Sequence, residues 1–325
     1  MPYVYSDTKK NPTPKPADPT TEKKTPQNYA DGVAANKPAP PVKRDLKDPE
    51  VVTKTDDATG AKTKDPYAYK ANDRNAQLYG PDGVKAGDVK QGAIADCYVP
   101  AAMSAVAAVG PQVIKDALKD NGDGTFTVRF FQLDYTGKKT EVKITVDADL
   151  PHNGEAPAYA KSTEVVDGKQ YMELWPSIIE KAYAQWKGSY DKIGHGGSAG
   201  DVMTALTGKA SRTTSTSGAE DPLWDKMKRA TAAGQAMCAG SGDKDDAKYK
   251  DPKAGVYGWH AYTVLGVEER KEGDKTVRIV KLRNPWGARR RAGDAATVGD
   301  TKNAAEFELT YAEFRRLYDD VYING

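Results

Sequence analysis

Gln91-Gly92-Ala93-Ile94-Ala95-Asp96-Cys97-Tyr98-Val99-Pro100 runs directly into the apolar segment Ala101 to Val109. Small and acidic residues precede Cys97, and an alanine-rich segment with Pro100 in its first turn follows, which predicts a helix that begins at the cysteine. Backbone amides and the dipole at a helix N-terminus lower the pKa of a thiol there and favour a nucleophilic thiolate. A small residue of the core is the other interpretation of Cys97, because free cysteines are often buried.

Composition limits the class of protein. Apolar residues make up 38% of the 325 residues, which is low for a chain that is folded throughout. The net charge of +2 gives no global field for binding nucleic acid or a membrane surface. We see no apolar run that could span a bilayer and no secretory signal in Met1 to Lys10. Two cysteines fit a reducing compartment, so we expect a cytoplasmic protein or one exported without a signal peptide.

The first part of the chain is predicted to be disordered. Residues 1–76 are rich in Lys, Pro, Thr, Asp and Ala and poor in large apolar side chains, so they cannot bury enough surface to offset chain entropy. This leader is either a solvated tail or a pro-segment that occupies the active site and inhibits the protein until it is removed. The sequence leaves that choice open.

Two subdomains are predicted after the leader, with a boundary in the glycine-rich stretch Ile193 to Gly200. Residues 77–195 contain the helix after Cys97, a second helical stretch at 113–118, a hairpin of alternating residues at 126–146 and a long helix from Glu173 to Gly188. Residues 196–325 contain short helices at 202–206, 222–233 and 311–318, with strands at 235–239, 261–268, 276–283 and 306–309.

A base for the thiol can be sought among the three histidines. His152 and His195 lie in predicted loops, where a lone histidine is usually solvated. His260 begins an alternating strand, which would fix its ring at the edge of a sheet. The next strand ends at Asn284, and if the two strands pair, its amide oxygen can accept the imidazole proton and hold the tautomer. Trp286 could shield that hydrogen bond from water.

These blocks resemble the calpain family of cysteine proteases. The likeness rests on Gln91-Gly92-Ala93 with Asp96-Cys97, on Gly258 with His260-Ala261-Tyr262, and on Arg283-Asn284-Pro285-Trp286-Gly287, in the order that the family has them. It extends to Trp175, Glu180-Lys181-Ala182-Tyr183-Ala184, Gly188-Ser189-Tyr190 and Thr207-Gly208. Tyr98 stands where the family usually has a tryptophan, and Trp259 before the histidine is unusual for it.

The resemblance implies an α+β, papain-like cysteine protease core, with the cysteine on the helix-rich subdomain and the histidine and asparagine on the strand-rich one. It implies that Cys97 is the nucleophile, His260 the general base and acid, and Asn284 the orienting group. Gln91 would share an oxyanion hole with the Cys97 backbone amide. The expected activity is endopeptidase cleavage of protein or peptide substrates through a thioester.

The resemblance also implies one regulatory calcium site, while the chemistry itself requires no cofactor. Asp88 and Glu173 stand where the family places carboxylate ligands, and Gly83 lies in a loop that could add carbonyl oxygens. A second family site departs from the pattern, because Arg290 replaces an expected acidic ligand.

Two other functions stay open at this stage. The same nucleophile, base and oxyanion hole could serve an acyltransferase or an amidase. A catalytically silent binding protein is the other alternative, although all four catalytic positions are intact.

Overall fold

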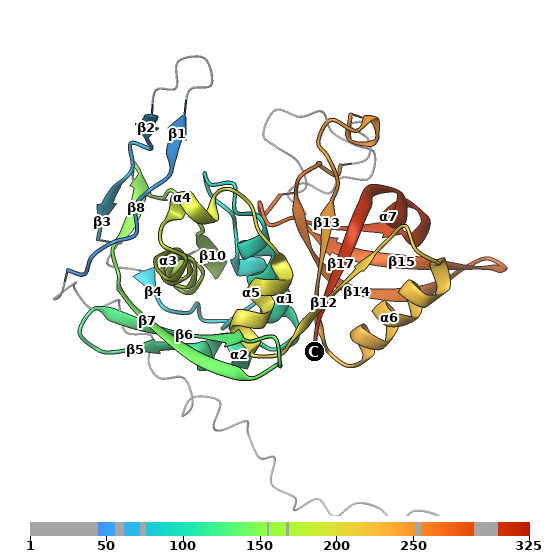
Figure 1. Cartoon of the computed structure of the whole chain (residues 1–325), viewed down its shortest axis with the longest axis horizontal. Helices are drawn as coiled ribbons and strands as arrows, with labels where there is room; N and C mark the ends of the chain where they lie inside the picture. The colour runs from blue at the N-terminus through green and yellow to red at the C-terminus, as the bar shows by residue number, and fades with distance from the viewer. Residues whose placement is uncertain are drawn as a thin grey trace, which may run out of the picture. The chain divides into compact units, whose positions relative to one another are not determined.

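The computed structural model describes residues 45–55, 62–71, 76–154, 156–166, 169–250, 255–288 and 305–325. Figure 1 shows a mixed α and β architecture. The described residues form two hydrophobic cores, and the first, built mainly from residues 76–206, also includes Ala236, Cys238 and Ala261. None of the helices formed by the described residues combines the length and the apolar character that crossing a bilayer requires.

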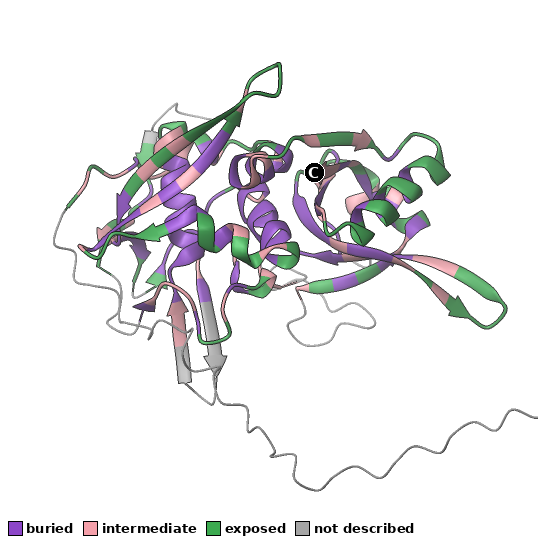
Figure 2. Cartoon of the chain, turned by 90° about the horizontal axis from the view of Figure 1, so that it is seen from below, coloured by how far each residue is buried: buried purple, intermediate pink, exposed green. Residues whose placement is uncertain are grey.

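The first core surrounds helix α1 (Tyr98–Val109), which begins at Cys97 as the sequence predicts. Residues Tyr98 to Ala107 are all buried, so the helix is enclosed rather than amphipathic, as the purple ribbon in Figure 2 shows. The predicted second helix is α2 (Pro111–Ala117), which starts with its proline. Cys97 therefore lies at the end of a helix with little freedom to move.

The predicted hairpin of the first core is confirmed. Strand β6 (Thr125–Leu133) pairs antiparallel with β7 (Lys139–Asp147), and β5 (Leu118–Asp120) extends the sheet on the other edge of β6. The predicted long helix is α3 (Trp175–Lys187), which ends at Gly188 in a left-handed conformation. Its Trp186 stacks on Phe130 of β6 with ring centroids 5.2 Å apart, which joins helix and sheet.

The second core is built on a six-stranded antiparallel sheet, in the order β12-β17-β13-β14-β15-β16. The predicted strands are β13 (Ala236–Ser241), β14 (Ala261–Glu272), β15 (Lys275–Arg283) and β16 (Glu306–Thr310). The predicted helices α6 (Glu220–Ala232) and α7 (Tyr311–Leu317) contribute Trp224, Met227 and Phe314 to this core. Strands β12 (Ser211–Ser215) and β17 (Tyr318–Asn324) were not predicted, because β12 is almost entirely polar and β17 follows α7 without a turn signal.

Order begins earlier than the predicted leader 1–76 allows, and this correction has a physical cause. Residues 1–44 lie outside the described part, but Tyr190 N donates to Glu50 O at 2.9 Å and Tyr69 Oη donates to Pro49 O at 2.7 Å. Strand pairing with the core orders residues that are too polar to fold alone. The short strands are β1 (Thr53–Thr55), β2 (Lys62–Lys64), β3 (Ala68–Lys70), β4 (Ala76–Gln77), β8 (Leu150–Asn153), β9 (Ala156–Pro157), β10 (Ser162–Val166) and β11 (Lys169–Glu173).

The first core also extends past the predicted boundary at residues 195 and 196. After α4 (Tyr190–Ile193), helix α5 (Ala199–Thr207) buries Val202, Met203 and Leu206 in the core of α1. Gly197 of the glycine stretch is packed, since a Cβ there would lie 2.5 Å from Cζ of Tyr98. Some of these glycines therefore serve close packing rather than flexibility.

A buried lysine fastens the early residues to the first core. Lys181 of α3 is 1% exposed, and its ammonium lies 2.6 Å from Asp48 and 2.5 Å from both Asp147 and Asp149. Burial disfavours the charged ammonium, but hydrogen bonds to these carboxylates outweigh burial and raise the pKa of Lys181. Leu46 N also donates to Asp147 at 2.6 Å. One cation thus holds residues 46–48 against α3 and the end of β7.

Replacing this lysine tests the anchor. Lys181→Met should lower the free energy of unfolding by about 3–5 kcal/mol, because buried carboxylates lose their counter-charge. Urea unfolding measures the change, and limited proteolysis should then cut near Asp48. Lys187→Met is the matched control at the exposed end of the same helix. An unchanged midpoint for Lys181→Met would contradict the anchor.

Candidate active site

The Cys97 thiol lies at the N-cap of α1 and is half-buried. Its sulfur interacts with the backbone N–H groups of Tyr98 and Ala261. Ala261 is the first residue of β14, so the contact brings the thiol to the residue that follows His260. The structure thereby joins the cysteine segment and the histidine segment, which lie far apart in the sequence.

The predicted lowering of the thiol pKa is wrong for this conformation. Burial raises the pKa of Cys97 to about 11, and the neighbouring Asp96 adds to the rise. The helix N–H of Tyr98 and the N–H of Ala261 oppose it, but their effect is smaller than that of burial. The thiol is therefore protonated at neutral pH, and attack requires a base that accepts its proton.

His260 and Asn284 meet at the ends of paired strands, as the sequence predicts. His260 Nε2 lies 2.9 Å from Asn284 Oδ1. Because Trp286 N also donates to Asn284 Oδ1 at 3.1 Å, the amide presents its oxygen, and the imidazole must carry its proton on Nε2. Nδ1 is then the basic nitrogen. Trp286 packs on the His260 ring with centroids 4.4 Å apart and limits access of water to this hydrogen bond.

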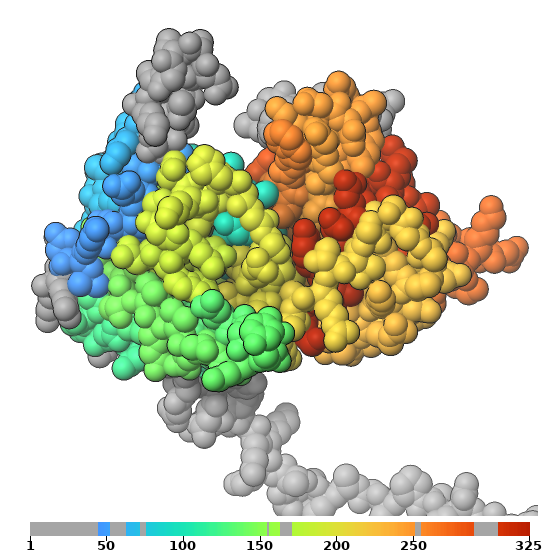
Figure 3. Space-filling model, in the orientation of Figure 1, coloured from blue at the N-terminus to red at the C-terminus, as the bar shows by residue number. Residues whose placement is uncertain are grey.

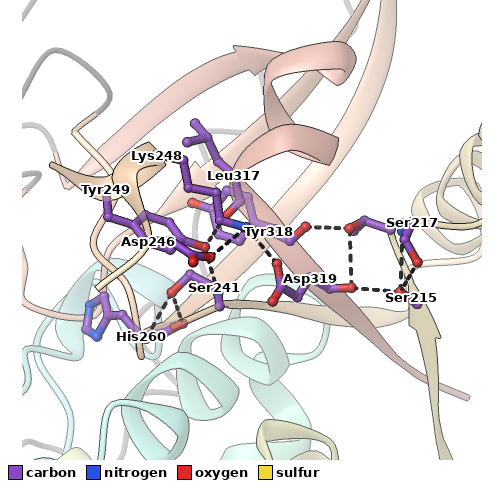
Figure 4. Close-up of polar contacts among 12 residues, drawn as sticks. Ser215, Ser217, Ser241, Asp246, Lys248, Tyr249, His260, Leu317, Tyr318 and Asp319 are labelled. Atoms are coloured by element: carbon purple, nitrogen blue, oxygen red, sulfur yellow. Dashed lines mark hydrogen bonds and ion pairs between the residues drawn. The ribbon is translucent and has the colours of Figure 1, made fainter. Parts of the chain in front are cut away.

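The main chain of His260 is held by Ser241 at the end of β13. Ser241 N donates to His260 O, and His260 N donates to Ser241 Oγ, both at 2.9 Å. Figure 4 shows that the imidazole points away from these contacts and from the Lys248–Asp319 ion pair beyond them. Ser241 thus fixes the main chain of His260, while the imidazole ring faces the candidate active site.

Gln91 also reaches the strand-rich half. Its backbone N–H donates to Pro285 O at 2.8 Å, one residue after Asn284. The side-chain Nε2 donates to Ile94 O at 2.7 Å, which leaves its second N–H to serve another acceptor. Gly92 follows, and a Cβ there would lie 2.2 Å from Ala158 O, so the loop needs a glycine at this position.

Arg283, for which the sequence predicts no structural role, connects the strand-rich half to the helix-rich half. This residue is 2% exposed and donates to Ser104 Oγ at 3.0 Å, to Gly87 O at 3.1 Å and to Val89 O at 2.6 Å. Burial lowers its pKa to about 10, so it stays charged at neutral pH. The sequence signal that could have indicated this role is a basic residue at the end of an apolar strand.

The other histidines and the second cysteine lie elsewhere. His152 is buried in β8, where Nδ1 donates to Leu150 O at 3.0 Å, so the expectation of a solvated loop is wrong for it. His195 is exposed beside Asp191. Cys238 is fully buried in β13, with Met203 Sδ 4.0 Å from its sulfur, as expected for a core residue.

The predicted calcium ligands Asp88 and Glu173 are already hydrogen-bonded. Gly80 N donates to Glu173 Oε1 at 2.5 Å, and Ser162 Oγ donates to Glu173 Oε2. Lys85 N and Trp175 Nε1 donate to Asp88 Oδ2 at 2.6 and 3.3 Å. Gly83 lies in the preceding turn with φ 76°, and Arg290 lies outside the described residues. Each carboxylate thus already accepts hydrogen bonds from the protein, and a calcium ion would have to share these oxygens with the protein donors.

A different acidic group lies in the first core. Oxygens of Asp45, Asp48 and Asp149 lie within 4.8 Å of one another, a spacing that could hold an ion. The Lys181 ammonium already contacts Asp48 and Asp149, so a cation of the protein itself neutralises part of this group.

A pocket of about 460 Å³ lies apart from these residues. It is lined by Phe131, Tyr135, Trp186, Asp201 and Ser211 among others, and neither Cys97 nor His260 reaches it. Figure 3 shows the face on which the hairpin β6–β7, in green, lies beside the yellow-green of α5. Because this pocket lacks the cysteine and the histidine that the sequence singles out, we place the candidate chemistry at Cys97 instead.

Comparison with known proteins agrees with this geometry. A family model described as calpain family cysteine protease matches residues 53–323. Calpain-9 of Rattus norvegicus is 25% identical over 202 residues, which cover 62% of this chain and 28% of that protein. Calpain-type cysteine protease ADL1 of Oryza sativa subsp. japonica is 32% identical over 215 residues, covering 62% and 9%. Calpain-13 of Rattus norvegicus is 27% identical over 262 residues, covering 74% and 37%.

The state of the thiol can be measured by alkylation. At pH 7, iodoacetamide should modify Cys97 on the order of 10²-fold more slowly in the folded protein than in urea, because its pKa is raised above that of a free thiol. The rate should rise with pH towards about 11. Peptide mapping separates Cys97 from Cys238. Fast modification that is independent of pH below 7 would instead indicate a thiolate paired with an imidazolium.

Two glycine variants test the loop that carries Gln91. Gly92→Ala should cost about 1–3 kcal/mol of stability, because its Cβ meets backbone carbonyls that cannot move cheaply. Gly87→Ala is the control, since nothing lies within 4 Å of the added Cβ. Both substitutions reduce the entropy of the unfolded chain alike. Equal thermal stabilities of the two variants would show that the loop around residue 92 can shift to accommodate a Cβ.

Proposed function

Because the chain belongs to the calpain family of cysteine proteases, we propose that it is a cysteine endopeptidase that cleaves peptide bonds through Cys97, His260, Asn284 and Gln91. The observation that carries the proposal is the contact of His260 Nε2 with Asn284 Oδ1 at 2.9 Å, beside a thiol that reaches the backbone of Ala261. These are the parts that acyl transfer to a cysteine needs: a nucleophile, a base and a group that orients the base.

The first step is attack by Cys97 on the scissile carbonyl. His260 Nδ1 takes the thiol proton as the C–S bond forms, because its other nitrogen already donates to Asn284. The imidazolium then protonates the leaving amine, the C–N bond breaks, and a thioester stays on Cys97. Water adds to the thioester with His260 again as the base, and release of the acid restores the thiol.

The negative charge that develops on the carbonyl oxygen needs donors. Gln91 Nε2 has one N–H beyond the one given to Ile94 O, and the Cys97 backbone N–H is the second donor in this proposal. Anchoring of the Gln91 main chain to Pro285 links this oxyanion hole to the segment of Asn284. A raised thiol pKa is compatible with this mechanism, since the base acts during attack rather than before it.

Substrates of this protein are proposed to be proteins or peptides, in keeping with its family. The chain spans well under two thirds of the length of the relatives with which it aligns. We derive no catalytic step through a metal ion, because the oxygens of Asp88 and Glu173 accept hydrogen bonds from the protein. Two regulatory hypotheses are activation by calcium and inhibition by residues 1–44. The same peptide-cleavage assay can test both.

Catalytic variants test the proposal. Cys97→Ala and His260→Ala should lower kcat/KM on a fluorogenic peptide library by on the order of 10³-fold or more, and Asn284→Ala by less. Cys238→Ala and His195→Ala are matched controls that should retain activity. Added amines should not divert the acyl group from hydrolysis. Failure of Cys97 to react with a peptide aldehyde or vinyl sulfone in any condition would sink the proposal and favour a binding protein.

Calcium and the N-terminal residues form two further arms of that assay. We expect equal rates in calcium and in a chelator, because the expected ligands are engaged. A variant lacking residues 1–44 keeps the Lys181 anchor intact, so a higher rate would identify those residues as an inhibitory segment. Activation by calcium would show that Asp88 and Glu173 exchange their donors for the ion, and Glu173→Gln should abolish it.

A further inference from the structure

Two carboxyl groups are buried at the loop that precedes the thiol. Asp96 precedes Cys97 in the loop before α1, and Glu180 lies in the middle of α3; both are 0% exposed. Neither belongs to the proposed chemistry or to the expected calcium ligands. Burying two acids is costly unless their charge is paired or neutralised, so their arrangement calls for a physical explanation.

The donors available to this pair are few. Ala160 N donates to Glu180 Oε1 and Oε2 at 3.1 and 2.9 Å. No donor from the described residues makes a well-formed hydrogen bond to either carboxylate oxygen of Asp96. Its side chain interacts with its own backbone N–H and with the Glu180 carboxyl, which lies within hydrogen-bonding reach. Two ionised carboxylates repel, so such a hydrogen bond requires a proton on one of them.

Among the described residues, the groups that interact with the pair add no positive charge. Those that interact with it electrostatically are Cys97 and Tyr98 at the start of α1, Tyr159 in the loop before β10, and Tyr190 of α4. All are neutral at neutral pH, because burial raises the pKa of each. Burial also raises the pKa of both Asp96 and Glu180 above the usual range of carboxyl groups. Two facing, buried carboxyl groups therefore favour a proton shared between them.

We propose that Glu180 is a positioning residue for Cys97, because its protonated carboxyl donates a hydrogen bond to Asp96 and holds the loop before α1. On one side, Glu180 accepts a hydrogen bond from Ala160 N. Two residues before Ala160, Ala158 O accepts a hydrogen bond of 2.8 Å from Ala93 N, which belongs to the Gln91 loop. On the other side it fixes the side chain of Asp96, whose carbonyl caps α1 by accepting Val99 N at 2.7 Å. A single side chain thereby supports both flanks of the nucleophile.

The shared proton makes this support sensitive to pH, with a defined sign. Because the folded-state pKa values are raised, the stabilising contribution is fully present below about pH 4 and falls as the pH rises through the folded-state values. Loss of the last shared proton leaves two facing anions in a dry site and pushes Asp96 away from Glu180. The link to catalysis rests on the proposed function, whereas the link to stability does not.

The variant Glu180→Gln tests whether Glu180 acts through a shared proton or only through packing of its side chain. The glutamine side chain of this variant would present its oxygen to Ala160 N and its NH₂ group to Asp96, so the hydrogen bond no longer needs a titratable proton. Thermal stability and the Cys97 alkylation rate are measured from pH 5 to 9 in each protein. We expect the wild type to lose stability across this range and Glu180→Gln to lose much less. Asp116→Asn, on the exposed face of α2, is the control for the change in charge.

Two more variants complete the test. Asp96→Asn should repeat the flattened profile, because its amide can donate to Glu180. Glu180→Leu removes the bond, and should destabilise the protein and raise Cys97 alkylation at least about fivefold through a loosened loop. An alkaline fall in kcat/KM that disappears in Glu180→Gln at unchanged KM would support positioning of the nucleophile.

The outcomes separate this inference from the proposed function. A Glu180→Gln profile as steep as that of the wild type would overturn the shared proton, and so would failure of both amide variants to fold. Unchanged alkylation in Glu180→Leu would overturn the positioning role. If the stability and alkylation profiles behave as expected while no peptide is cleaved by any protein, the pairing stands and the peptidase proposal fails.

Discussion

The buried guanidinium of Arg283 is the contact on which the arrangement of the site depends. Arg283 ends β15 in the strand-rich core, yet its three acceptors belong to the segment 87–104 of the helix-rich core. Removing a guanidinium from water is expensive, and the hydrogen bonds to these three acceptors offset part of that cost. Asn284 and Pro285 follow immediately and contact His260 and Gln91. The position of one arginine therefore fixes the segment that contacts both His260 and Gln91.

Electrostatics around the thiol favour uncharged groups. Burial keeps the Cys97 proton in place, and the pair Asp96 and Glu180 is stabilised with a proton between its members. A thiolate placed next to an ionised Asp96 would add a second negative charge in a poorly solvated loop, which works against a preformed ion pair. The helix N-terminus alone cannot overcome this cost. In the proposed mechanism, His260 therefore accepts the thiol proton only once substrate is bound and the developing charge lies under the donors of Gln91.

The sequence allowed much of the fold to be predicted because its strongest signals are local. The alanine-rich run after Cys97, the alternation from Phe126 and the strands around His260 and Arg283 have a clear period, and each forms the expected element. Residues 45–55 and 62–71 escaped prediction because distant partners order them, above all Lys181 for Asp48. The same limit applies to the site. The proximity of His260 and Asn284 follows from strand pairing, whereas the pairing of Asp96 with Glu180 depends on how α3 packs.

The backbone beside His260 is strained. Trp259 is the one non-glycine residue among those described with a positive φ, at 49°, a conformation that costs a bulky residue about 1–2 kcal/mol. It is held there because Trp259 N donates to Gly242 O at 2.7 Å, while Ser241 fixes both backbone groups of His260. Gly258 is locked as well, since a Cβ would lie 2.4 Å from Lys244 Cα. With its indole 63% exposed, Trp259 gains little from burial that could offset the strain. The hydrogen bonds to β13 must therefore outweigh it, and what they secure is the orientation of the next residue, His260.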